Sequence, residues 1–265
     1  MPSVFSVTSA ELTAWVTTFF YPFVRMLALM STAPVFSEKS VPRKVKVGLA
    51  AILSIVLAPG IGPVPPVPIV SPGGIWIIVQ QVLIGAGMGF TMKLVFAAVQ
   101  AAGEYISLQM GLSFASFFDP MAGGTTMVVG RLLNMLAMLL FLAFDVHLLL
   151  VSVLAESFQT LPIADAPLSG GGWLFLVESA SQVFISGLML SLPLVTALLI
   201  LNLAMGILNR ASPQFSIFAV GFPLTLLAGI AMLLLLIPNL GAFLEPRFAE
   251  SVAGVLRLTQ ALRGP

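Results

Sequence analysis

The chain has 265 residues, of which 8% are charged and 59% are hydrophobic. Soluble globular domains usually contain about 25% charged and about 45–50% apolar residues, and the mean hydropathy here is +1.11. So few charges cannot cover a soluble surface, so the composition excludes a water-soluble monomer. It also excludes a disordered chain, which needs high charge and low hydrophobicity, and a nucleic-acid binder, which needs a basic face.

The absence of cysteine narrows the chemistry further. With no cysteine in the chain, disulfides, thiolate metal sites and cysteine nucleophiles are excluded. Residues 1–11 lack a positively charged region ahead of an apolar stretch, so a cleaved signal peptide is not expected. We therefore expect an integral membrane protein in which the first long apolar segment directs insertion.

The first half of the chain is divided by its charges and its prolines. A membrane-spanning helix needs about 20 apolar residues, and the first predicted helix covers residues 12–30, with Arg25 inside it. The run between Lys46 and Lys93 has no charge but is interrupted by prolines and glycines. Because proline breaks helices, this run predicts helices over residues 45–58 and 75–102, joined by a corner.

The second half predicts longer apolar segments separated by helix breakers. The expected order is an apolar stretch over residues 105–118, a breaker at 119–124, and helices over 127–158, 173–208, 217–236 and 243–262. Pro193 is expected to kink the second of these helices, and the charged last helix has the composition of an interfacial amphipathic helix. Several segments have unsuitable lengths for one membrane crossing, so a simple six- or seven-span topology is not expected.

One loop carries a concentrated positive charge. Lys39, Arg43, Lys44 and Lys46 lie close together and are opposed only by Glu38. Loops rich in lysine and arginine face the cytoplasm. This basic loop is therefore predicted to be cytoplasmic, with the amino terminus on the other side of the membrane.

A few ionisable residues lie within apolar segments. Asp145, His147 and Glu178 are candidate buried polar residues, and such residues often mark proton or substrate paths. Residues two apart do not share a helix face, so Asp145 and His147 form no obvious dyad. The alternatives are a proton relay and ordinary interhelical hydrogen bonds. Glu178 and Lys93 lie near segment ends, where their side chains can extend to the interface or pair.

Two glycines predict a close helix contact. Gly85 and Gly89 form a Gly-x-x-x-Gly pattern in an apolar helix, and small residues at this spacing let a second helix backbone approach. The second helix can belong to this chain or to another one. No phosphate-binding loop follows the pattern.

The chain shows no pattern of a catalytic site. It contains a single histidine, and no Ser–His–Asp order, paired carboxylates or metal-ligand cluster stands out. We therefore expect neither an enzyme nor a cofactor or metal site.

Three stretches together resemble a known family. They read RMLALMSTAPVFSEKSVPRKVK over residues 25–46, GEYISLQMGLSFASFFDP over 103–120 and LNRASPQFSIFAVGFPLTL over 208–226. Each combines helix breakers with isolated charges. In this order and spacing they resemble the FliR/SctT family of the type III secretion export apparatus, over essentially the whole chain.

The resemblance implies an all-α subunit of a protein channel. In that family one copy joins several FliP and FliQ subunits in a helical, multi-subunit export gate in the bacterial inner membrane, at the flagellar basal body. By this resemblance, residues 1–172 form a FliP-like part and residues 173–265 a FliQ-like part. FlhB is expected outside the gate and FlhA below it, and exported flagellar proteins and membrane lipid are the other expected partners.

The resemblance also implies a channel plug over about residues 111–126. The residues that match the family's plug are Gly111, Leu112, Ser113, Phe114, Ala115, Phe117, Phe118, Asp119 and Pro120. Small residues and three phenylalanines suit a segment that fills a lumen, and irregular backbone at membrane depth must be buried in protein or line a cavity. From the residues alone, an ordinary interhelical turn is the alternative.

A function of a different class stays open at this point. Asp145, His147 and Glu178 could serve a proton-coupled small-molecule transporter. Such transporters usually contain an inverted repeat with paired broken helices, and the sequence has no such pairing. A transporter should also be stable alone in detergent, whereas a gate subunit should need its partners.

Overall fold

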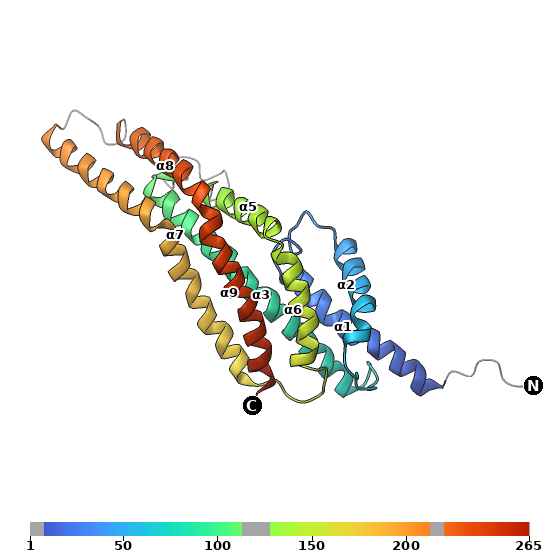
Figure 1. Ribbon diagram of the computed structural model, residues 1–265. Helices are drawn as coiled ribbons and strands as arrows, with labels where there is room; N and C mark the ends of the chain where they lie inside the picture. The colour runs from blue at the N-terminus through green and yellow to red at the C-terminus, as the bar shows by residue number, and fades with distance from the viewer. Residues whose placement is uncertain (1–7, 113–127, 213–219, 265) are drawn as a thin grey trace, which may run out of the picture. The chain divides into compact units, whose positions relative to one another are not determined.

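All regular secondary structure in the described part of the chain is helical. The computed structural model describes residues 8–112, 128–212 and 220–264 (Figure 1), and none of these residues belongs to a strand. This confirms the all-α prediction. The elements are α1 (Ser9–Thr32), α2 (Arg43–Leu57), η1 (Ala58–Gly60), α3 (Pro72–Gln109), α5 (Val128–Ala143), α6 (Val146–Thr160), α7 (Gly170–Ala211), α8 (Phe222–Leu236), η5 (Ile237–Asn239) and α9 (Leu240–Arg263).

A capping box defines the start of α1. The Thr8 hydroxyl accepts a hydrogen bond from the backbone N–H of Glu11, and the Glu11 carboxylate accepts one from the backbone N–H of Thr8. This reciprocal pair satisfies donors that the first turn leaves free. The predicted helix over residues 12–30 is therefore confirmed and is slightly longer at both ends.

The predicted corner between the second and third helices is also confirmed. α2 ends at Leu57, a short 3₁₀ turn follows, and α3 begins at Pro72. Proline at the start of a helix costs no hydrogen bond, since the first N–H groups have no partner in the helix. The proline-rich segment thus ends one helix and begins another.

The prediction that the third helix ends near residue 102 is wrong. α3 continues to Gln109, through Gly103. A side chain at Gly103 would collide with the backbone of Gly130 on α5. The glycine therefore permits close helix packing here and does not end the helix, and the packing compensates for its low helix propensity.

The single helix predicted over residues 127–158 is divided in two. α5 ends at Ala143 and α6 begins at Val146, because Asp145 adopts a left-handed backbone with φ of 54°. Aspartate enters this region more readily than most residues. No proline or glycine marks the break, which is why the apolar pattern missed it.

Among the residues that the structure describes, four helical stretches are long and apolar enough to cross a membrane, or five if α5 and α6 together form one broken span. The four stretches are Glu11–Thr32, Pro72–Gln109, Gly170–Ala211 and Phe222–Arg263. Within the chain, 56% of the 18-residue apolar window of the second stretch is buried, compared with 33% for the third and 17% for the last. The carboxyl-terminal helices α7 and α8 thus leave most of their apolar surface uncovered.

The chain forms two compact units that alternate along the sequence. Unit 1 consists of Met1–Lys93, Asp145–Ser179 and Ala249–Pro265, and unit 2 of Leu94–Phe144 and Ala180–Phe248. In unit 2, Phe96, Phe141 and Phe248 form an aromatic cluster with ring centroids 5.5–5.8 Å apart. In unit 1, Val255, Leu258 and Leu262 of α9 are buried, so these apolar side chains of the last helix pack inside the protein. The interfacial position of this helix stays a prediction.

Within unit 1, α3 and α1 are in close backbone contact. A side chain at Gly85 would collide with the carbonyl oxygen of Arg25, and one at Gly89 with Thr32 and the backbone nitrogen of Ala33. The helix opposite the Gly-x-x-x-Gly face is therefore α1 of the same chain. The contact between these two helices leaves no space for a methyl group at Gly85.

We expect Gly85→Ala to lower the thermal stability of the full-length chain, purified in the complex in which it is recovered. The added methyl group must push α1 away from α3, and such overpacking usually costs about 1–3 kcal/mol, or a decrease of roughly 5 °C in the midpoint of unfolding. Thermal unfolding in detergent measures this.

Gly206→Ala is the matched control, because Gly206 on α7 has open space around it. Alanine favours a helix by about 1 kcal/mol relative to glycine, so this variant should be as stable as the wild type or slightly more so. Equal stability of the Gly85 and Gly206 variants would contradict the close contact.

Candidate functional site

Unit 1 is held together around a completely buried arginine. Arg25 has no exposed surface. Its guanidinium group donates hydrogen bonds to two other helices and to the residue that caps the second of them. Nε donates to Oε1 of Gln81 on α3 (2.7 Å), Nη1 to the carbonyl oxygen of Ser157 on α6 (3.0 Å), and Nη2 to the carbonyl oxygen of Leu161 just after α6 (3.0 Å). One side chain of α1 thus joins α3 to the end of α6.

The charge of Arg25 is compensated without a carboxylate. In the part of the chain that the structure describes, its acceptors are an amide, a hydroxyl and two backbone carbonyls. The carbonyl oxygen of Ser157 also accepts the N–H of Leu161 (3.0 Å), whereas Leu161 itself is the cap of α6, where carbonyls lack partners in the helix. The helix dipole is negative at this end. The guanidinium also lies 4.3 Å from the ring centroid of Phe158, a favourable cation–π distance.

The sequence contained a signal for this site that the analysis did not use. Arg25 is the only charge within the apolar part of α1, and buried arginines in membrane helices commonly pair with backbone carbonyls. Its acceptors Ser157 and Leu161 lie 132 and 136 residues away. No local pattern identifies partners at such a distance.

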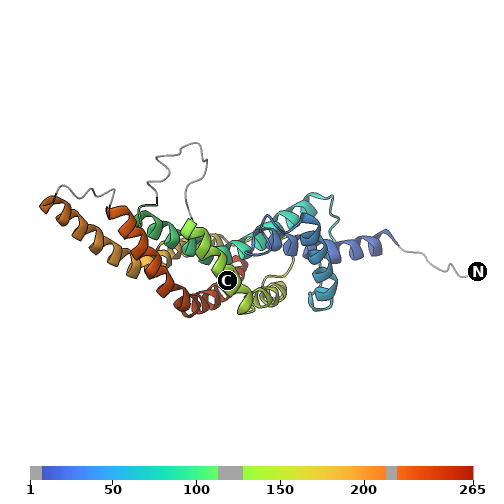
Figure 2. The same ribbon diagram turned by 90° about the horizontal axis from the view of Figure 1, so that it is seen from above.

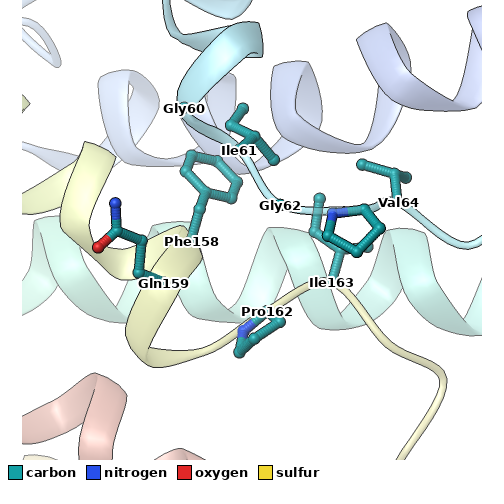
Figure 3. Close-up of a pocket in the computed structure, with 9 residues that line it drawn as sticks. Gly60, Ile61, Gly62, Val64, Phe158, Gln159, Pro162 and Ile163 are labelled. Carbon is teal, nitrogen blue, oxygen red and sulfur yellow. The ribbon is translucent and has the colours of Figure 1, made fainter.

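An apolar cavity of about 340 Å³ lies beside this arginine site (Figure 3). The ring of Phe158 both lines the cavity and contacts Arg25. The lining comes from two segments, the turn after α2 and the end of α6 with the loop behind it: Gly60, Ile61, Gly62, Pro63, Val64, Phe158, Gln159, Pro162 and Ile163. With a single polar side chain, Gln159, this cavity has no convergent polar groups for chemistry.

In unit 2, the end of α3 is fixed by two neighbouring helices. Asn202 of α7 donates to the carbonyl oxygen of Gln109, and Thr225 of α8 donates to that of Met110, both at 3.4 Å. The side chain of Met110 is buried and lies over Gly229 of α8, where a Cβ atom would approach it within 2.5 Å. α3 therefore ends at a tightly packed point.

The predicted plug begins at this packed end. Gly111 has a φ of 78°, a conformation in which glycine commonly ends helices, and its N–H donates to the carbonyl oxygen of Leu108 (3.1 Å). Gly111 and Leu112 are described, and the other plug residues, Ser113, Phe114, Ala115, Phe117, Phe118, Asp119 and Pro120, lie outside the described residues. After this segment, α5 packs on α3 through Gly130 and Gly103, so both flanking helices belong to one packed hairpin.

The basic loop lies on the surface of unit 1. Lys39, Arg43 and Lys44 are exposed, and Lys46 is half-buried. Lys46 donates to the backbone oxygen of Glu38 (3.4 Å). The four cations therefore surround the start of α2, which has no acidic residue in its first turn.

The three candidate buried polar residues differ in their surroundings within the chain. Asp145 and Glu178 are exposed, and His147 is half-buried. Nδ1 of His147 is buried and has no hydrogen-bond partner among the described residues. Asp145 occupies the break between α5 and α6, His147 lies at the start of α6, and Glu178 lies on α7. Within the described residues, no three His, Cys, Asp or Glu side chains are grouped to hold a metal ion.

Comparison with known proteins identifies the family. The family model described as bacterial export proteins, family 1, matches residues 16–251. The match includes the buried arginine, the glycine face of α3 and the flanks of the predicted plug. It covers nearly the whole chain.

Individual relatives agree with this match over their full lengths. The flagellar biosynthetic protein FliR of Pectobacterium carotovorum subsp. carotovorum is 51% identical over 91% of this chain and 92% of its own length. The protein of the same name from Escherichia coli K12 is 50% identical over 92% of this chain and 93% of its own length. The protein of the same name from Bacillus subtilis is 31% identical over 82% of this chain and 84% of its own length.

We expect Arg25→Met to prevent recovery of a folded chain. The substitution fits by volume but removes the donor to Oε1 of Gln81 and to the carbonyl oxygen of Leu161, at about 1–3 kcal/mol for each buried group left unsatisfied. The carbonyl oxygen of Ser157 keeps the N–H of Leu161 as a donor. Arg25→Lys should be intermediate, because one ammonium group keeps the charge but cannot span all three acceptors. The yield of monodisperse protein in detergent and its unfolding midpoint measure both effects.

Arg131→Met is the control, since Arg131 is an exposed arginine on α5. It should leave the yield unchanged and change the free energy of unfolding by no more than about 0.5 kcal/mol, as is usual for surface substitutions. An Arg25→Met variant as stable as this control would show that the buried hydrogen bonds do not hold unit 1 together.

Proposed function

This chain belongs to family 1 of the bacterial export proteins, the family of the flagellar biosynthetic protein FliR, and we propose that it is a structural subunit of the flagellar type III export gate. In this proposal it assembles with FliP and FliQ and forms part of the channel wall through which flagellar proteins are exported. The observation that carries the proposal is the full-length similarity to the FliR relatives.

The exposed apolar surface of α7 and α8 supports an assembly of this kind. On α7, Phe184, Ile200 and Leu203 are 64–69% exposed, and on α8, Leu227 and Leu235 are 66% and 72% exposed. Side chains of this size need a covering of lipid or protein. In a gate they are covered by neighbouring subunits.

We propose the same division of the chain that the family resemblance implies. Residues 1–172 are the FliP-like part and residues 173–265 the FliQ-like part. α7 and α8 are the two long apolar helices of the second part, and their uncovered faces are suited to contact FliQ subunits.

The plug is a further part of the proposal. A channel wide enough for an unfolded polypeptide leaks ions unless something fills it at rest. Residues 111–126 supply three phenylalanines and one charge, Asp119, and begin at the packed end of α3, where Thr225 and Asn202 hold the last carbonyls. A firmly anchored base allows the segment itself to be displaced without disturbing the wall.

The remaining partners follow from the gate. FlhB contacts the outside of the gate and FlhA lies below it, with the assembly in the bacterial inner membrane at the flagellar basal body. In this role the chain performs no bond chemistry, so the energy for export comes from other components.

Deleting residues 113–123 and joining the ends with a short linker should keep assembly but make cells leaky. The deletion removes the filling segment and leaves α3, α5 and their glycine contact in place. The chain is co-expressed with FliP and FliQ, co-purification of the three proteins reports assembly, and uptake of a small impermeant dye reports leakage.

Two outcomes would contradict different parts of the proposal. If the wild-type chain does not co-purify with FliP and FliQ, it is not a subunit of that gate. If the deletion variant assembles and the cells exclude the dye as well as the wild type does, the seal lies elsewhere.

A further inference from the structure

The polar and apolar surfaces of α2 are separated along its length. Its first turn carries Arg43, Lys44 and Lys46, and Lys39 lies just before it. Beyond Lys46 the only polar side chain is Ser54, which is buried and donates to the carbonyl oxygen of Ala50 (2.7 Å). The helix thus has a cationic end and an uncharged body.

One side of this body packs on the protein and the other side is uncovered. Ala50 and Ser54 are buried, and Ser54 contacts the sulfur of Met26 on α1 (3.2 Å), so this side lies against α1, as both views show (Figures 1 and 2). The aliphatic side chains on the remaining surface are 44–65% exposed: Val45, Val47, Ile52, Ile55 and Val56.

The length of α2 shows how far it can reach into a membrane. It has 15 residues, which correspond to about 22 Å at about 1.5 Å per residue. The hydrocarbon core of a bilayer is about 30 Å thick. A helix of this length passes one leaflet and ends inside the core, unless other segments continue the crossing.

The cations at the start of α2 lack a compensating anion in the first turn. The positive end of the helix dipole lies there, and its first turn has no acidic residue and no side-chain cap. Among the described residues, Lys46 donates to the backbone oxygen of Glu38. Like charges at this end repel each other and oppose the dipole. An external anionic surface would remove both penalties.

We propose that α2 inserts end-on into an anionic membrane leaflet. Its basic end binds the phosphate headgroups of anionic phospholipids, and its aliphatic side lies among their acyl chains. A leaflet presents negative charge and hydrocarbon in the same order as α2 presents positive charge and aliphatic side chains. A protein partner would have to supply an acidic cluster next to an apolar groove. The inference does not depend on the proposed function.

Brominated lipids test both halves of this proposal. The chain has no cysteine, so Val47→Cys or Val56→Cys can each carry a single fluorophore, near the basic end and far along the apolar body. The full-length chain, in the complex in which it is recovered, is reconstituted in vesicles that contain acyl-brominated phosphatidylglycerol or acyl-brominated phosphatidylcholine at the same mole fraction. Bromine quenches a fluorophore that it contacts.

Both lipids should quench the label at Val56, since acyl chains surround it. At Val47, the anionic lipid should quench more strongly, with an enrichment of about fivefold or more at low salt, because each basic residue near an anionic surface contributes about 1 kcal/mol, a fivefold gain. In the variant Lys39→Gln/Arg43→Gln/Lys44→Gln, the two lipids should quench the label at Val47 equally, which gives a ratio of about 1. The matched variant Lys93→Gln/Arg131→Gln/Arg210→Gln, which removes three exposed charges elsewhere, should keep the wild-type ratio.

Each other result overturns the proposal. Absence of quenching at Val56 would show that protein and not lipid covers α2. The basic end does not select anionic headgroups if the two lipids quench the label at Val47 equally in the wild type. The same conclusion follows if the triple variant at positions 39, 43 and 44 keeps the wild-type ratio of quenching by the two lipids. If that variant cannot be recovered, the wild-type ratio must fall towards 1 in high salt, where charge attraction is screened, and a constant ratio would refute the proposal.

Discussion

The burial of one guanidinium group constrains the packing of unit 1. Arg25 has to satisfy its donors away from water, and it can do so only if the end of α6 and the amide of Gln81 are both within reach of α1. The requirement acts together with the glycine face of α3, since Gly85 lies against the carbonyl oxygen of Arg25 itself. The same residue thus fixes the α1–α3 contact by its backbone and the position of α6 by its side chain.

This arrangement has consequences beyond the arginine. Holding the last turn of α6 places Phe158 over the guanidinium and leaves the neighbouring cavity next to the turn after α2. In unit 2 the corresponding fixed point is the end of α3, held by α7 and α8. Each unit therefore has a well-packed interior, whereas the outer faces of α2, α7 and α8 carry large apolar side chains that the described residues leave exposed. Such a protein is stable only within a larger apolar environment.

The sequence predicts the helices well where the signal is local. Charge-free runs located the membrane-type helices, and the prolines and glycines before Pro72 located the corner between α2 and α3. The predictions of two helix ends failed. Gly103 looks like a helix breaker, but α3 continues through it because Gly130 packs against it. Asp145 looks like part of a helix, but it takes a left-handed conformation that ends α5.

The hydrogen bonds of Arg25 were not predictable, because their acceptors are far away in the sequence and two of them are backbone carbonyls, which any residue provides. The role of the plug came only from family resemblance, since its composition also suits an ordinary turn.

The central claim is that other export-gate subunits cover the apolar faces of α7 and α8. A photo-crosslinking amino acid placed at Leu203 of α7 or Leu235 of α8, which are 66% and 72% exposed, tests it most directly in cells that build flagella, with Leu198, which is buried in α7, as the control position. The account predicts adducts with FliP or FliQ from the two exposed positions and none from Leu198. Adducts with lipid alone from Leu203 and Leu235 would contradict it.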